Sequence, residues 1–179
     1  MIINGENNLC QDLLTHLEDP DYCDVKIVGN DGEIPVNKTI LGMRSQYFHA
    51  MFKPSSNFVE SRSGSVKMPY SETVIRKVVI YIYSGKMDCS DLVLGQLLEL
   101  LDLLRLVDLT REFSKVEEFF RVNIKKACYP LSDCLEGLDD SSKRRLEKVE
   151  AELLALLGEN FEKISKKETF GISLKSISL

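Results

Sequence analysis

Polar and apolar residues recur at regular spacings along most of this chain, and the first third divides into short elements. Leucines fall at positions i, i+4, i+5 and i+8, which predicts one apolar stripe on a short helix: Leu9, Leu13, Leu14 and Leu17. That helix is expected to run from about Leu9 to Glu18, since an Asp-Pro-Asp sequence follows. Alternation over 24–28 predicts a half-buried strand, and a Gly-Asn-Asp-Gly turn leads to a returning strand over 33–36. Pro35 lacks a backbone donor, so the returning strand should be short or lie at an edge.

The segment 36–52 has apolar residues at helical spacing, with Arg44-Ser45 interrupting the run where a second helix can start. This predicts a compact helical hairpin with Asn37 as its N-cap. The serine-containing stretch 53–62 is expected to be a loop, and 65–68 a third short strand. A hairpin followed by an aromatic residue and an acid is typical of a docking surface rather than of a reaction centre.

Three helices are predicted next. Ser71 is expected to cap a helix that ends before Gly85, where a left-handed residue fits. A second helix is expected over Leu92–Val107, opened by Ser90-Asp91. A third begins at Asp108 or Thr110, and its inner side is predicted to carry Phe113, Val116, Phe119, Phe120 and Ile124.

The composition shifts near Lys125, and two further helices are predicted before the polar tail that follows Lys166. A short helix is expected over 130–138, followed by a turn and cap over 139–142. A long helix is expected from Arg144 to Ile164, with one apolar stripe formed by Leu146, Val149, Leu153, Leu156 or Leu157, Asn160 and Ile164. The stripe covers barely three heptads, which favours a helix packed on a domain over a coiled coil.

The charge and the cysteines narrow the classes of function. The net charge is −5, with 28 acidic against 23 basic residues, which argues against nucleic acid as a partner. The most apolar run, Leu92–Leu109, carries charged residues throughout and cannot span a bilayer, so no membrane partner is expected. No secretory signal is visible at the start. Five cysteines at irregular spacing then predict reduced, mostly buried thiols in a cytoplasmic or nuclear protein.

The sequence contains few candidates for catalytic residues. The two histidines, His16 and His49, each fall in a predicted helix near its polar side, and no nucleophile can be tied to either by spacing. No Cys-x-x-Cys pair or Gly-rich phosphate loop is present, so no metal and no cofactor are expected. We therefore expect a protein that is not an enzyme, although a deep polar pocket around His49 would favour a catalytic interpretation.

The order of elements and three motifs resemble the BTB/POZ family. Tyr22-Cys23-Asp24-Val25 resembles the family's Phe-Cys-Asp-Val entry to its first strand, and Tyr81–Gly85 resembles its Tyr-Ile-Tyr-Ser/Thr-Gly motif. The segment 38–52 is similar to a family pattern that ends in Ser-x-Tyr-Phe-x-x-Met-Phe, although Asn37 stands where the family usually has histidine. The resemblance implies an α+β BTB/POZ fold over 1–126, with a small three-stranded sheet flanked by helices.

The remainder, 127–179, resembles the start of an all-α BACK domain. Asp133-Cys134-Leu135 is similar to the Asn-Cys-Leu of that domain, and Glu159–Ile164 is similar to its Asn-Phe-x-x-Ile/Val motif. Family members with this arrangement are usually adaptors of cullin-3 ubiquitin ligases. The resemblance therefore implies a homodimeric adaptor that binds the cullin-3 N-terminal domain and positions a protein substrate.

The resemblance also implies where each partner binds. Phe58-Val59-Glu60 matches the hydrophobic-x-Glu motif that such adaptors use on the cullin, and the expected cullin-binding residues are Phe58, Glu60, Ser61, Tyr47 and Met51. A simpler alternative is that Phe58 folds back onto its own domain. The leucine stripe of the N-terminal helix is expected to form the dimer interface, although it could instead cap the monomer core. A dimerisation module in transcriptional or cytoskeletal regulation, without ligase binding, is the alternative function.

Overall fold

The computed structural model describes residues 6–17, 19–56, 58–124 and 131–159. The chain divides into two compact units, Met1–Val116 and Glu117–Leu179, which are described in turn. The division falls inside one helix, ten residues before the domain boundary that the sequence suggests. The boundary at residue 126 therefore stays a prediction.

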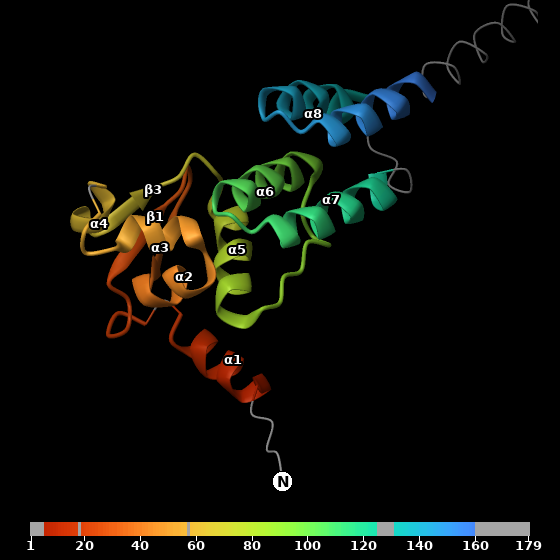
Figure 1. Ribbon diagram of the computed structural model, residues 1–179. Coiled ribbons are helices and arrows are strands. Elements are labelled where there is room, and N and C mark those ends of the chain that lie inside the picture. Colours follow the sequence, from red (N-terminus) through yellow and green to blue (C-terminus); the bar gives the residue numbers. More distant parts are fainter. Residues whose placement is uncertain (1–5, 18, 57, 125–130, 160–179) are drawn as a thin grey trace, which may run out of the picture. The chain divides into compact units, whose positions relative to one another are not determined.

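The first unit holds a three-stranded sheet in the order β2-β1-β3 (Figure 1). The strands β1 (Val25–Val28) and β2 (Glu33–Val36) are antiparallel, and Gly29 N–H donates to the Gly32 carbonyl at 2.8 Å to close the turn between them. The strand β3 (Ser65–Lys67) pairs with β1 in parallel. Pro35 thus lies on an edge strand opposite Lys26, as its missing donor predicts.

Helices surround this sheet within the first unit. They are α1 (Glu6–Thr15), α2 (Lys38–Arg44), α3 (Gln46–Phe52), α4 (Glu60–Ser63), α5 (Glu72–Ser84), α6 (Leu94–Leu106) and the first part of α7 (Thr110–Ile124). Figure 1 shows the α2–α3 hairpin over the strands, with α5 and α6 beside it. The predicted hairpin is confirmed, including the break at Ser45 and the Asn37 cap, whose side chain accepts from Thr39 and Ile40 N–H groups.

The core of this unit combines all three strands with the apolar faces of α5 and α6. Ile27, Ile34 and Val66 are each at most 1% exposed, as are Leu98 and most other leucines of α6. The αL residue Gly85, at φ 72°, ends α5 as the sequence predicts. Each strand therefore presents one buried face to the helices, which leaves the short loops and helix ends available for binding.

The described part of the second unit comprises the end of α7, the helix α8 (Leu131–Lys143) and a helix over 147–159. Its buried residues include Phe120, Cys134 and the predicted stripe residues Leu146, Val149 and Leu153. Asn160 and Ile164 lie outside the described residues. Lys148 pairs with Glu117 at 2.9 Å, and Arg144 with Asp140 at 3.0 Å.

Several predictions of local structure are wrong. The expected loop over 53–62 ends in α4, and α8 continues through the turn expected over 139–142, since Lys143 and Arg144 pair with the carboxylates one turn earlier. Phe119 is 39% exposed rather than internal. The expected hydroxyl cap of α5 is absent because Ser71 donates to Glu99 instead.

The thiols are also less buried than predicted. Among the described cysteines only Cys134 is buried, whereas Cys10, Cys23 and Cys89 are half-buried, and none of these four forms a disulfide. Cys128 lies outside the described residues. None of the helices in the described ranges is both long and apolar enough to cross a membrane.

Candidate partner-binding surface

The segment 58–60 lies on the surface, at the entry to α4. Phe58 is 52% exposed and Val59 is 75% exposed. Phe58 N–H donates to the Ser56 hydroxyl at 3.1 Å, and Gly64, at φ 69°, ends the short helix in the left-handed conformation. About half of Phe58 is therefore accessible to solvent and the rest is covered by its own domain, so the cullin contact and the alternative, in which Phe58 folds back onto its own domain, both stay predictions.

Tyr47, on α3, lies close enough to Glu60 for the two side chains to interact electrostatically. Burial raises the pKa of the Tyr47 phenol, and the negative charge of Glu60 raises it further. The phenol therefore stays protonated at neutral pH and remains a hydrogen-bond donor beside a carboxylate. Residues 47 and 58–60 thus form a surface of one aromatic ring, one β-branched residue, one phenol and one acid, which we call the φ-acid surface.

Met51 and Ser61, the two other predicted cullin-binding residues, are not among the residues of the φ-acid surface. Met51 is only 3% exposed and packs in the core beneath α3, so its predicted direct role in binding is wrong for this surface. It falls in the core because it follows Phe48, itself 1% exposed, by three positions on the same face of α3. Ser61 belongs to α4, but its side chain lies outside what the structure describes.

The predicted dimer helix α1 presents its leucines in two directions. Leu9 is 61% exposed, whereas Leu13, Leu14 and Leu17 are half-buried. Leu14 lines a cavity of about 500 Å³ together with Cys10 on α1 and with Ile80, Ser84 and Met87 from α5 and the segment after it. Leu14 therefore faces the protein's own α5, and Leu9 is the stripe residue most open to a second copy.

The two histidines lie in unlike surroundings. His16 follows the end of α1; its ring packs on Tyr22 with centroids 4.0 Å apart, and its Nδ1 lies 3.8 Å from Asp19. His49 is exposed on α3 and borders an open, mostly apolar groove of about 340 Å³. This groove is not the deep polar pocket that a catalytic interpretation of His49 requires. No group of three metal-ligating side chains occurs within the ranges 6–17, 19–56, 58–124 and 131–159.

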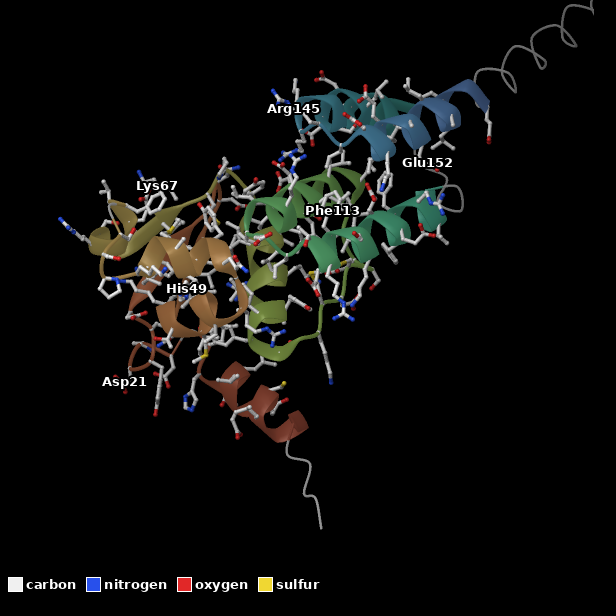
Figure 2. All side chains as sticks on the ribbon, in the orientation of Figure 1. Asp21, His49, Lys67, Phe113, Arg145 and Glu152 are labelled. Atoms are coloured by element: carbon white, nitrogen blue, oxygen red, sulfur yellow. The ribbon has the colours of Figure 1, made fainter. Side chains whose placement is uncertain are left out.

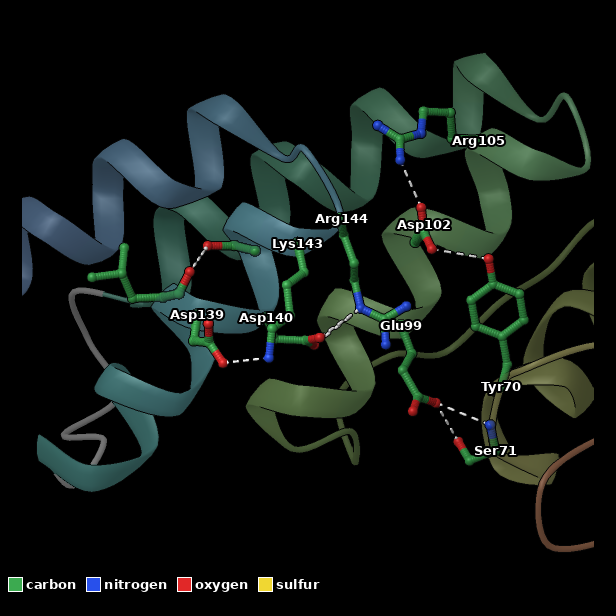
Figure 3. A network of polar contacts seen from close by, with 11 residues as sticks. Tyr70, Ser71, Glu99, Asp102, Arg105, Asp139, Asp140, Lys143 and Arg144 are labelled. Carbon is green, nitrogen blue, oxygen red and sulfur yellow. Dashed lines mark hydrogen bonds and ion pairs between the residues drawn. The ribbon is translucent and has the colours of Figure 1, made fainter.

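A polar network secures the segment between β3 and α5 to α6 (Figure 3). The Tyr70 hydroxyl donates to Asp102 at 2.9 Å, and Asp102 also pairs with Arg105 at 2.7 Å. Ser71 donates through its backbone N–H and its hydroxyl to Glu99, at 3.0 and 2.7 Å. Tyr70 and Ser71, which precede α5, are thereby joined to Asp102 and Glu99 of α6, and these hydrogen bonds hold the start of α5 against α6.

Sequence reasoning missed Val59 and Met43, which are among the most exposed apolar side chains, at 75% and 76%. The first lies inside the motif that singled out its two neighbours. Met43 lies two positions after Leu41 on α2, so the two side chains point to different sides of the helix. Leu41 is fully buried, and helical spacing alone could therefore have placed Met43 on the exposed side.

Comparisons with known proteins agree on one family. The family model of the BTB/POZ domain matches residues 13–120, more than half of the chain. Kelch-like protein 38 of Mus musculus is 27% identical over 155 residues, which cover 83% of this chain and 26% of the relative. Kelch-like protein 30 of Homo sapiens is 27% identical over 166 residues, which cover 89% and 27%. The chain thus spans about a quarter of the length of these relatives.

Two solved structures share the fold. The BTB domain of human Gigaxonin matches with a TM-score of 0.50 and 23% identity, covering 66% of this chain and 96% of that one. The BTB domain of zebrafish PATZ1 matches with a TM-score of 0.51 and 20% identity, covering 71% and 98%. Both matches support the small sheet with its surrounding helices.

Proposed function

The chain belongs to the BTB/POZ domain family, and on that premise we propose that it is a homodimeric adaptor, not an enzyme, that binds cullin-3 in a ubiquitin ligase complex. Its similarity to two Kelch-like proteins over more than four fifths of its length supports an adaptor role. Cysteines that form no disulfide among the described residues fit a reducing compartment, so we propose that the protein acts in the cytoplasm, the nucleus or both.

The observation that carries the proposal is the half-exposed Phe58 beside Glu60. An aromatic side chain on a short segment can fill a pocket on a partner, and burying the exposed half of Phe58 contributes roughly 1–2 kcal/mol. Anchors of this kind dominate many interfaces. Glu60 and the Tyr47 phenol add a charge and a donor at the rim, which favour one orientation of the partner.

Dimerisation would be provided by α1, through Leu9 and the outward parts of Leu13 and Leu17. A self-complementary apolar patch closes into a two-fold dimer, in which the same residues of both copies meet. Two linked copies bring two ligase arms near one target and raise the local concentration of ubiquitin carriers. We assign residues 127–179 to the start of a BACK-like region that extends the scaffold. The protein substrate would be held without being chemically changed by this chain.

Isothermal titration calorimetry of the full chain with the purified N-terminal domain of cullin-3 tests the proposal. The wild type should bind, and the double variant Phe58→Ala/Glu60→Ala should bind at least about tenfold more weakly, as expected for loss of an interface anchor. Both substitutions lie at the surface, so circular dichroism and thermal unfolding should be unchanged.

Met43→Ala is the matched control, because Met43 is a large exposed apolar residue on the same helical hairpin but outside the φ-acid surface. It should bind cullin-3 like the wild type. Undiminished affinity of the double variant would refute the assignment of the surface, whereas no binding by the wild type would refute the adaptor function itself and favour a dimerisation module.

A further inference from the structure

The groove beside His49 lies on a different side of α3 from the φ-acid surface. Tyr47 and His49 are two positions apart on a helix, which turns their side chains about 200° from each other. The groove runs between α2 and α3, whose side-by-side packing Figure 2 shows around the labelled His49. Its lining residues are Lys38, Thr39, Gly42, Met43, His49, Phe52, Lys53 and Pro54.

The groove combines an apolar floor with basic side chains. Phe52, Pro54 and Met43 supply the apolar surface, and Met43 is 76% exposed. An exposed methionine adapts its shape to different partners and is common on peptide-binding surfaces. Two lysines and His49 border the same hollow, with the Lys38 ammonium 5.8 Å from the centre of the Phe52 ring.

The charge of this region is opposite to that of the chain. The protein carries 28 acidic residues and a net charge of −5, yet the 26 residues 34–59 contain no aspartate or glutamate and carry Lys38, Arg44, Lys53 and His49. Asp24 is the carboxylate that reaches the start of α2, where it accepts the backbone N–H of Lys38 at 2.8 Å. A positive hollow on a negative protein favours an acidic ligand and repels a basic one.

The groove lies where α2 and α3 pack closely against each other. A Cβ at Gly42 would stand 3.5 Å from the Cα of His49, which is an ordinary contact distance between the two helices. A volume of about 340 Å³ is at the low end of the ~300–1,000 Å³ range for small ligand sites. The groove therefore suits one bulky apolar side chain with acidic neighbours.

We propose that the groove between α2 and α3 binds a short acidic segment of a partner protein, with one bulky apolar side chain seated against Met43 and Phe52. Its carboxylates would lie against Lys38, His49 and Lys53. This site goes beyond the proposed cullin contact and does not depend on it, since the two surfaces share no residue. Nucleic acid fits less well, because most of the lining is apolar and phosphate contacts need clustered cations.

The test uses three sets of short fluorescent peptides with the same leucine–phenylalanine core and flanks of glutamate, serine or lysine. Fluorescence anisotropy with the full chain should show that the glutamate set binds most tightly. Its affinity should fall in 1 M salt, where charges more than about 3 Å apart are screened. Equal binding of the three sets, or binding of none, would overturn the proposal.

Two variants locate the binding. His49→Glu/Lys53→Glu should weaken the glutamate set at least about tenfold, because the contact with Lys53 changes from attraction to repulsion and a second carboxylate replaces the imidazole of His49. Met43→Ser should weaken all three sets through loss of apolar contact. Lys67→Glu reverses one charge at an exposed position of β3 outside the groove lining and should leave the affinity unchanged.

The same variants separate the other possible occupants. Analytical ultracentrifugation of His49→Glu/Lys53→Glu should give the mass of the wild type; a monomer in place of a dimer would mean that a second copy covers the groove. Tighter binding of a DNA duplex or of anionic vesicles than of any peptide set, lost in this variant, would also overturn the proposal. Cullin-3 binding should be the same in this variant as in the wild type, which keeps the two sites distinguishable.

Discussion

The buried hydroxyl of Ser45 donates a hydrogen bond to the backbone carbonyl of Val107, 2.7 Å away and 62 residues later in the chain. The same oxygen accepts from Phe48 N–H at 3.3 Å and so caps α3. One side chain therefore breaks the helical hairpin and ties that break to the end of α6.

Replacing Ser45 with alanine should lower the free energy of unfolding by about 1–3 kcal/mol. The substitution leaves the Val107 carbonyl and the Phe48 N–H buried without their partner. Urea titration followed by circular dichroism measures the change. Ser114→Ala removes an exposed hydroxyl that bonds the Thr110 carbonyl and should alter the free energy by less than about 0.5 kcal/mol. Equal effects of the two substitutions would contradict a special role for Ser45.

The oxygen and the nitrogen of the Asn37 side-chain amide both form hydrogen bonds. Its oxygen caps α2 at 2.9 and 3.2 Å, and its Nδ2 donates to the Tyr22 carbonyl at 2.8 Å. Asn37→Ala should cost about 1–2 kcal/mol, since cap and bridge are both lost. Asn37→Asp keeps the cap oxygen and should cost less. Thermal unfolding of the two variants ranks them; a larger loss in the aspartate variant would contradict the cap as the main contribution.

Leu9 is the stripe residue on α1 that is most open to solvent, at 61% exposure. If α1 forms the dimer interface, Leu9→Glu should place a charge in an apolar contact and shift the protein to a monomer. Sedimentation velocity over a range of concentrations measures the shift. Val93→Glu, at a site 63% exposed elsewhere in the same unit, is the control and should leave the mass unchanged. A Leu9→Glu variant that stays dimeric would move the interface away from this face.

The raised pKa values of three tyrosines predict that the folded protein becomes less stable at alkaline pH. Burial is the largest cause that raises the pKa of Tyr47, Tyr81 and Tyr83; the hydroxyl of Tyr81 also donates to Glu112 at 2.5 Å. The unfolded chain therefore loses these protons first, near pH 10, and the free energy of unfolding falls as pH rises from there through the folded pKa values.

Urea titrations between about pH 8 and pH 11 measure this dependence. The Tyr81→Phe variant, which has no phenol at this position, should show a shallower fall than the wild type. Phenolate absorbance of the folded protein should rise at higher pH than that of the unfolded chain. A fall of equal steepness in both proteins would contradict the part assigned to Tyr81.

Much of the fold could be predicted because local signals and tertiary packing agree. The turn residues between β1 and β2, the cap at Asn37 and the αL glycine at position 85 each act within a few residues. Where a distant partner decides, sequence reasoning fails. Ser71 has the residue type of a helix cap, but Glu99, 28 residues later, takes its hydroxyl.

The binding surface, too, could be predicted only in part from the sequence. The motif at 58–60 identifies Phe58 and Glu60, but not that Tyr47 would lie close enough to the acid for its pKa to be raised. Met51 is a predicted cullin contact only because the family resemblance implies it. Its three-residue spacing from Phe48 places both side chains on one face of α3, and the packing of that face against the core buries them.

The parallel pairing of β1 with β3 has a consequence for how the protein folds. Lys26 lies opposite Ser65, so the helical hairpin and the φ-acid surface are both enclosed in the crossover between these strands. Closing so long a connection is entropically costly, and contacts distant in sequence form late. The third strand should therefore be the last to join the sheet during synthesis, and a nascent chain would display Phe58 before its supporting strand is in place.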